Sequence, residues 1–207
     1  MQELMSVAAI TGALAIGAMS PGPTFVVVAR TAAGVSRSHG FMTALGSGLG
    51  AGVFALLALL GLHAVLAAVP MAFWVLKIGG GCYLLYLAYQ ILRHARAPLA
   101  FDGKSGKKRG LTKTLLFGLL TQLANPKTAI VFAGVFSALL PAQISPWMYA
   151  VLPLCAFTVD TLWYLLVAFA LSAEKPRQTY LRAKTAIDRT AGFVMTALGL
   201  KLLLGNS

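Results

Sequence analysis

Long apolar runs, separated by short polar or basic links, dominate the chain. They cover about residues 4–29, 41–68, 71–92, 114–140, 147–172 and 190–205. About 20 apolar residues in an α-helix are enough to cross the roughly 30 Å hydrocarbon core of a bilayer. The pattern therefore predicts an all-α membrane protein with six transmembrane helices.

The composition agrees with this fold class. Hydrophobic residues make up 58% of the chain and charged residues 11%, with a mean hydropathy of +0.81, far from the balance of soluble domains. In 207 residues, six crossings leave almost no room for a separate soluble domain. We therefore expect a single transmembrane domain over residues 1–207.

The positive charge of the chain lies mainly in the links between the apolar runs. The formal net charge is +12, and fourteen of the seventeen Lys and Arg residues fall at Arg30 and Arg37, in residues 93–113 and in residues 175–189. These clusters follow the first, third and fifth runs, as the positive-inside rule expects of cytoplasmic loops. The distribution predicts both termini on the outer side and favours membrane lipid over nucleic acid as the partner of the basic surface.

Nothing in the sequence indicates a cofactor or a metal site. Cys82 and Cys155 lie in apolar runs without a CxxC spacing, so we interpret them as small core residues. The three histidines, His39, His63 and His94, are too scattered for metal-ligand spacing.

A break interrupts the first apolar run at "AMSPGPTFVV", residues 18–27. Ser20 combines a favoured N-cap residue with Pro21 at the first helical position, so a half-helix is expected to begin there. Pro21 and Pro23 have no amide hydrogen, which leaves carbonyl groups one turn earlier without helical partners. The fourth run has a similar break at "LANPKTAIVF", residues 123–132, where Asn125 precedes Pro126.

Each break belongs to the first segment of a group of three segments. Because three is odd, the second group enters the membrane inverted, which predicts two inverted three-helix repeats at about 4–92 and 114–205, joined by a cytoplasmic linker at about 93–113. In lipid, broken helices are tolerated where they line a cavity. Paired breaks of this kind indicate the binding site of a secondary transporter near the bilayer midplane.

Two charged residues lie deep within the apolar runs. Lys127 is fourteen residues from both Lys113 and Pro141, and Asp160 lies near the middle of the fifth run. Half-helix N-termini with Lys127 favour a carboxylate, while freed carbonyls with Asp160 favour an ammonium. The constellation predicts a zwitterion such as an amino acid, with an anion or a cation alone left open. The predicted substrate-binding residues are Ser20, Pro21, Gly22, Pro23, Thr24, Gln122, Asn125, Pro126, Lys127 and Asp160.

The second run contains two overlapping pairs of glycines at a spacing of four residues. They are Gly46, Gly48, Gly50 and Gly52. Small residues at this spacing permit close approach of helices. We favour contacts within one chain, while the alternative is contact between two copies in a homodimer.

Several short motifs together resemble the lysine exporter and homoserine/threonine exporter (LysE/RhtB) family. They are "SPGP" at 20–23, "LKIGGGCYLLYLAY" at 76–89, "NPK" at 125–127, "VD" at 159–160 and "DRTAG…LGLKLLL" near the end. The resemblance implies six helices in the bacterial inner membrane and efflux of amino acids or related metabolites by a proton-driven antiporter. Asp160 is then the candidate proton carrier. Gln122 departs from the asparagine that is common there in the family.

Three alternatives remain at this point. An exporter of a metal or another cation lacks a set of ligands, and a passive channel would use the same cavity without coupling. An intramembrane enzyme is disfavoured, because Ser47 and His63 lie sixteen residues apart in one segment and no third group supports them.

Overall fold

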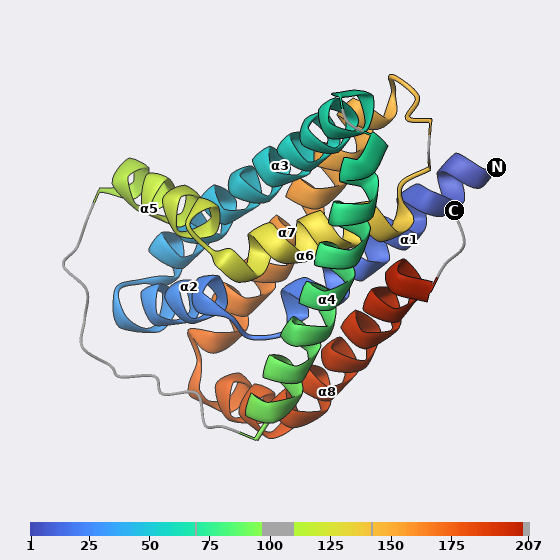
Figure 1. Cartoon of the computed structure of the whole chain (residues 1–207). Coiled ribbons are helices and arrows are strands. Elements are labelled where there is room, and N and C mark those ends of the chain that lie inside the picture. The colour runs from blue at the N-terminus through green and yellow to red at the C-terminus, as the bar shows by residue number, and fades with distance from the viewer. Residues whose placement is uncertain (69, 97–109, 142, 205–207) are drawn as a thin grey trace.

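The computed structural model describes residues 1–68, 70–96, 110–141 and 143–204. Over these residues the chain forms α-helices joined by short links (Figure 1). The helices are α1 (Gln2–Met19), α2 (Pro23–Gly34), α3 (Arg37–Ala68), α4 (Pro70–His94), α5 (Leu111–Leu123), α6 (Pro126–Leu139), α7 (Met148–Leu171) and α8 (Glu174–Leu204). The prediction of an all-helical protein is confirmed.

The first and fourth predicted segments are each split into two helices. The axis bends by 58° between α1 and α2 and by 57° between α5 and α6. Over the described residues, α3 and α7 are long and apolar enough to cross a membrane, and each bent pair meets the same test as one span. The structure therefore contains two to four candidate spans by length and composition, with both breaks where the prolines predict them.

The last helix is longer than the hydropathy pattern predicts. Helix α8 begins at Glu174, so all of residues 175–189, which we expected in a link, are helical. Within this stretch Lys184 and Asp188, four residues apart, form an ion pair on one face of the helix. Hydropathy locates the apolar part of a helix and misses polar turns that continue it.

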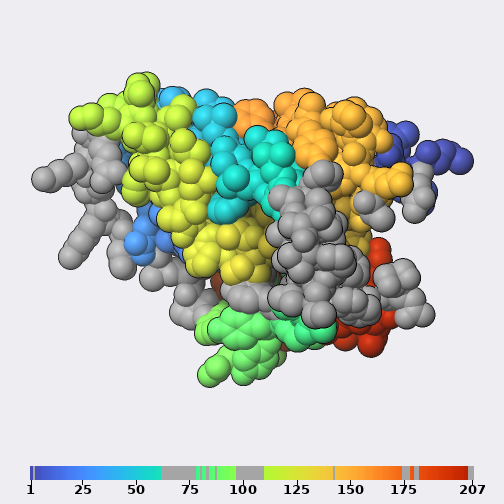
Figure 2. All heavy atoms as spheres, turned by 45° about the horizontal axis from the view of Figure 1, so that its top comes forward, coloured from blue at the N-terminus to red at the C-terminus, as the bar shows by residue number. Residues whose placement is uncertain are grey.

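Helix α3 lies between α5 and α7, and its glycines permit this packing (Figure 2). A Cβ atom at Gly46 would overlap the carbonyl oxygen of Leu115 in α5. One at Gly48, on another side of α3, would overlap the hydroxyl of Thr161 in α7. Gly50 faces α5 in the same way, since a Cβ there would lie 2.8 Å from Cβ of Gln122, whereas a Cβ at Gly52 would make only ordinary contact with Pro153 and Phe157 of α7. Both glycine pairs are thus used within one chain, as favoured from the sequence.

Helices α4 and α8 run antiparallel, side by side, and make a reciprocal contact (Figure 1). A Cβ atom at Gly81 of α4 would lie 2.6 Å from Cγ of Leu203, and one at Gly192 of α8 would lie 2.5 Å from Cγ of Leu92. The same offset in residue number relates Gly81 to Gly192 and Leu92 to Leu203, so each helix places a glycine against a leucine of the other. Helix α4 packs in addition on α6, where a Cβ at Gly134 would lie 2.5 Å from Leu84.

The prediction that both cysteines are core residues is wrong for Cys82. Its side chain is exposed, while Cys155 is half-buried. Gly81 occupies the side of α4 that meets α8, and successive residues of a helix point about 100° apart. Cys82 therefore points away from that contact.

Two apolar clusters fill the interior, one above the other along the long helices. In α7, Met148, Leu152 and Ala156 belong to the first cluster, and residues 164–171 contribute to the second. The first broken segment divides in the same way, since α1 packs in the first cluster and α2 in the second. Asp160 lies between the two clusters, at the level where the breaks occur.

Candidate functional site

A chain of hydrogen bonds between buried side chains connects α2, α3, α5 and α7 between the two apolar clusters. Asp160 accepts from Oγ of Ser47 at 2.7 Å and from Nε2 of Gln122 at 3.2 Å. Oε1 of Gln122 accepts from Oγ1 of Thr24 at 2.7 Å, and Thr24 accepts from Nδ2 of Asn125 at 2.9 Å. Buried polar groups need such partners, most of all in lipid. The network joins both breaks to the deep acid.

The break between α5 and α6 is built as the sequence predicts. Asn125 occupies the N-cap position, Pro126 begins α6, and Oδ1 of Asn125 accepts from the backbone N–H of Lys127 at 3.0 Å. The carbonyl of Gln122, which Pro126 deprives of its helical partner, accepts from the N–H of Asn125 at 3.0 Å. That carbonyl is therefore satisfied locally, unlike our expectation of a bare acceptor.

The break between α1 and α2 differs from the prediction. Helix α2 begins at Pro23, with Gly22 at its N-cap position and no side-chain cap, so Ser20 is not the cap. A residue before proline is driven to extended backbone, and Ser20, with ψ of 124°, shows this before Pro21. The extended Ser20–Gly22 stretch turns the chain before the second proline starts the helix. The hydroxyl of Ser20 is free to bond elsewhere, and it donates to Asp188 at 3.1 Å.

The two breaks contact each other through Lys127. Its ammonium Nζ donates to the carbonyl oxygen of Ser20 at 2.6 Å. This carbonyl lies at the C-terminal end of α1, where the helix dipole favours a positive charge. Gly22 lies against the lysine stem, since a Cβ there would be 3.0 Å from Cδ of Lys127. The contact brings together the two breaks that the sequence predicts to form one site.

A cavity of about 450 Å³, counting its opening, lies beside the breaks. Its wall comes from α1, the two breaks, α6 and α7: Leu14, Gly17, Ala18, Gly22, Gln122, Asn125, Lys127, Thr128, Val131, Phe132, Ala156, Val159, Asp160 and Tyr164. Small-molecule sites typically combine apolar walls with a few polar groups, as this wall does. The structure thus brings five predicted residues to one cavity wall: Gly22, Gln122, Asn125, Lys127 and Asp160.

The other predicted residues support the wall from behind. Thr24 is buried and holds Gln122 and Asn125, while Ser20 holds Lys127. The rings of Pro21, Pro23 and Pro126 are not among the residues of the wall described above. Their contribution lies in the backbone, which they bend at both breaks.

The cavity wall carries one cationic and one acidic side chain. Lys127 donates to Ser20, and Asp160 accepts from Ser47 and Gln122. An ammonium has three donors and a carboxylate about four acceptor sites, so both groups keep capacity for a ligand. Over the described residues, no group of three or more His, Cys, Asp or Glu side chains could hold a metal ion.

Sequence reasoning missed three polar residues of this region. Ser47 was considered only as a nucleophile, whereas its hydroxyl is bonded to Asp160; the side chain of His63, its suggested partner, lies outside the described residues. Lys184 and Asp188 were assigned to a link because the start of α8 was misplaced. Their spacing of four residues with opposite charges was the available signal.

Comparisons with known proteins show the family of the chain. The family model of the LysE type translocator matches residues 15–206. The chain belongs to this family. The resemblance noted in the sequence is therefore confirmed, and LysE type translocators are transporters rather than enzymes.

Relatives of this LysE type chain include proteins named for amino acid efflux. The threonine efflux protein of Escherichia coli (strain K12) is 34% identical over 204 residues, covering 92% of this chain and 94% of the relative. The leucine efflux protein of Salmonella choleraesuis (strain SC-B67) is 28% identical over 129 residues, covering 61% of this chain and 59% of the relative. An uncharacterized membrane protein of Haemophilus influenzae is 30% identical over 191 residues, covering 90% of each chain. No solved structure matches the chain.

Proposed function

We propose that this translocator is a secondary active exporter of amino acids that binds its substrate in the cavity between the two breaks. The observation that carries the proposal is that Lys127 and Asp160 line the same buried cavity. The names of the threonine and leucine efflux relatives support the same class of substrate.

The two charges suit the two ends of a zwitterion. The substrate carboxylate binds the ammonium of Lys127 at the N-terminal end of α6, where the helix dipole also favours an anion. The substrate ammonium binds the carboxylate of Asp160. Gln122 and Asn125, which line the wall between them, orient the substrate by hydrogen bonds. Apolar residues such as Val131 and Phe132 surround the rest of the molecule.

The proposed membrane arrangement has six crossings in two inverted repeats. The crossings are α1 with α2, α3, α4, α5 with α6, α7 and α8. The nearly equal bends at the two breaks support this division, and so does the reciprocal contact of Gly81 and Gly192 with Leu203 and Leu92. The start of α1 and the end of α8 lie on the same side of the molecule, as an even number of crossings requires (Figure 1). We place that side outside the bacterial inner membrane, with the basic linker 93–113 in the cytoplasm.

Asp160 couples export to proton entry by holding one of two positive partners. When the cavity faces the outside, a proton binds Asp160, removes its charge and releases the substrate ammonium. When the cavity faces the cytoplasm, the proton leaves and the carboxylate binds a new substrate. Each cycle then exchanges one substrate for one proton.

Binding measurements on the purified chain test the site. We expect Lys127→Met and Asp160→Asn each to weaken L-threonine binding at least tenfold, because each removes one charge pair. Lys113→Met, a lysine exposed outside the cavity, is the matched control. Propylamine and propionate, which carry one charge each, should bind far more weakly than the amino acid. Unchanged affinity in both variants would remove the proposal.

Flux measurements separate the alternatives. A passive channel gives flux that does not saturate and does not respond to a pH gradient. A metal exporter gives efflux that a chelator abolishes. Metabolite profiling of cells with and without overexpression then identifies the substrate, since its external level rises.

A further inference from the structure

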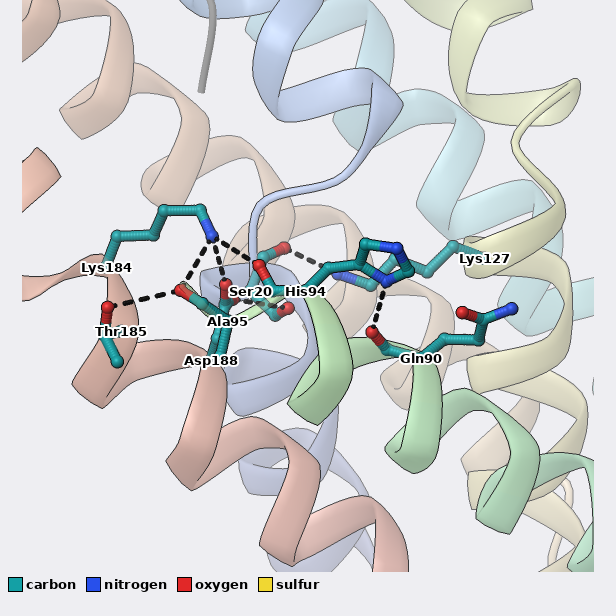
Figure 3. A network of polar contacts seen from close by, with 8 residues as sticks. All are labelled: Ser20, Gln90, His94, Ala95, Lys127, Lys184, Thr185 and Asp188. Atoms are coloured by element: carbon teal, nitrogen blue, oxygen red, sulfur yellow. Dashed lines mark hydrogen bonds and ion pairs between the residues drawn. The ribbon is translucent and has the colours of Figure 1, made fainter. Parts of the chain in front are cut away.

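A second chain of buried polar contacts leads away from the cavity to α4 and α8 (Figure 3). The carbonyl oxygen of Ser20 accepts a hydrogen bond from the ammonium of Lys127. The hydroxyl of Ser20 donates a hydrogen bond of 3.1 Å to Oδ1 of Asp188. Oδ2 of Asp188 pairs with Nζ of Lys184 at 2.8 Å. Nζ of Lys184 also donates to the carbonyl oxygens of His94 and Ala95, both at 3.1 Å. The path thus runs from the cavity cation to the C-terminal end of α4.

Every side chain that links these contacts is removed from solvent. The exposed fraction is 2% for Ser20, 6% for Lys184 and 4% for Asp188. Taking two charges out of water costs free energy that their pairing seldom exceeds, and apolar residues in their place are often as stable or more stable. Stability alone therefore does not account for the pair. Its position does, because it is bonded to the residue that holds Lys127.

We propose that Asp188 is a positioning residue that fixes Ser20, and through Ser20 the ammonium of Lys127, for binding the substrate carboxylate. The proposal rests on the proposed function, since it requires Lys127 to bind substrate. Ser20 stands in extended backbone between two helices, and its two polar groups bond in different directions. Holding the hydroxyl on α8 therefore orients the carbonyl toward Lys127.

Lys184 makes this arrangement depend on how α8 sits against α4. It bonds to the last carbonyls of α4 and to Asp188 at once, so the carboxylate is in place only while α4 and α8 keep this register. A shift of the pair relative to α1 breaks the Ser20–Asp188 bond and releases Lys127. Affinity for the substrate carboxylate thereby depends on the position of the α4–α8 pair.

A double-mutant cycle on the purified full chain tests the positioning role. We expect Asp188→Ala, which removes the acceptor of the Ser20 hydroxyl, to weaken L-threonine binding roughly tenfold, in the range of coupling between residues of one network. In a Lys127→Met background the same change should have no further effect on binding, because the group that it positions is gone. Effects that multiply in the double variant would instead show that Asp188 acts independently of Lys127, and would overturn the proposal.

Asp188→Ala leaves Lys184 buried without its ion-pair partner, so further variants are needed to separate loss of positioning from loss of folding. Lys184→Met with Asp188→Leu replaces the whole pair, so we expect a melting temperature near that of the unmodified chain with the same loss of binding. Ser20→Ala keeps the carbonyl that Lys127 uses but removes the hydroxyl that Asp188 holds, so it should weaken binding about as much as Asp188→Ala. Thr190→Ala, an exposed hydroxyl two residues along α8, is the control and should bind normally.

The outcomes distinguish this proposal from the one on which it rests. Unchanged binding in Lys127→Met contradicts the proposed function itself. Weakened binding in Lys127→Met, together with normal binding in Asp188→Ala and in the Lys184→Met, Asp188→Leu double variant, overturns the positioning role alone. Weakened binding in all of them, without a further effect in the combined variant, supports both.

Discussion

Oγ of Ser47 in α3 donates a hydrogen bond of 2.7 Å to Oδ2 of Asp160 in α7, at the level between the two apolar clusters. The bond holds one carboxylate oxygen in place, and Gln122 holds the other. The acid is therefore positioned by neighbours on two other helices, α3 and α5. Its role can be tested by removing the charge while keeping the hydrogen bond from Ser47.

We predict that Asp160→Asn abolishes coupling to a pH gradient. The amide oxygen still accepts from Ser47, but the side chain no longer binds a proton or pairs with an ammonium. In proteoliposomes, accumulation of L-threonine driven by a pH gradient should fall to the level of passive leak. Ser47→Ala, which keeps the acid and loses one hydrogen bond of about 1 kcal/mol, should reduce transport only severalfold. Gradient-driven transport that is unchanged in Asp160→Asn would end the coupling role.

We predict that Gly46→Ala is among the most destabilising single changes in α3. The added methyl group meets the backbone oxygen of Leu115, which no change of rotamer can move away. Overpacking of this kind costs about 1–3 kcal/mol. Thermal melting in one detergent should show a lower midpoint for Gly46→Ala. Gly12→Ala in α1 is the matched control, because no atom lies within 4 Å of its added Cβ, and its midpoint should be unchanged or higher. Equal midpoints for the two variants would mean that α3 and α5 are not in close contact.

We predict that Asn125→Ala destabilises the chain by about 2 kcal/mol. It removes an N-cap, worth about 1 kcal/mol, and a buried hydrogen bond to Thr24 of similar size. Asn125→Asp keeps an oxygen for the cap and loses the amide donor. Its melting midpoint should therefore lie between those of the unmodified chain and of Asn125→Ala. Thr121→Ala, which loses a hydroxyl bond to Phe117 within α5, is the control and should change stability by less than about 0.5 kcal/mol. A midpoint for Asn125→Ala as high as that of the control contradicts the capping role.

Much of the broken-helix architecture follows from the sequence because proline acts locally. Pro126 removes an amide and Asn125 supplies a cap, and both effects need only neighbouring residues. The depth of Lys127 and Asp160 follows from counting residues along apolar runs. The prediction of a cap at Ser20 was wrong because either Pro21 or Pro23 could begin the helix, and the helix begins at Pro23.

Contacts between distant segments could not be obtained from the pattern. Ser20 and Asp188 are 168 residues apart, and nothing in either neighbourhood encodes their bond. The outward direction of Cys82 likewise depends on which side of α4 meets α8. Hydropathy sets how much of a helix is apolar, whereas its partners are set by the packing of all segments together.

We predict that the link between α6 and α7 faces the outside of the cell and the start of α3 the inside. With Cys82 and Cys155 replaced by alanine, Gln143→Cys should react with a membrane-impermeant maleimide on intact cells. Ser38→Cys, an equally exposed position, should react only after the cells are made permeable. The opposite pattern of labelling would reverse the proposed orientation.

Helix α6 packs on α4 through Gly134, but over the described residues no close contact joins α2 to α8, the corresponding pair in the other half. Halves that match in sequence pattern are thus packed unequally. If the two proposed repeats exchanged roles, α8 would rest on α2 and α4 would leave α6, so that the cavity would open toward the opposite face. A solute would cross the bilayer as the chain alternates between these two asymmetric packings.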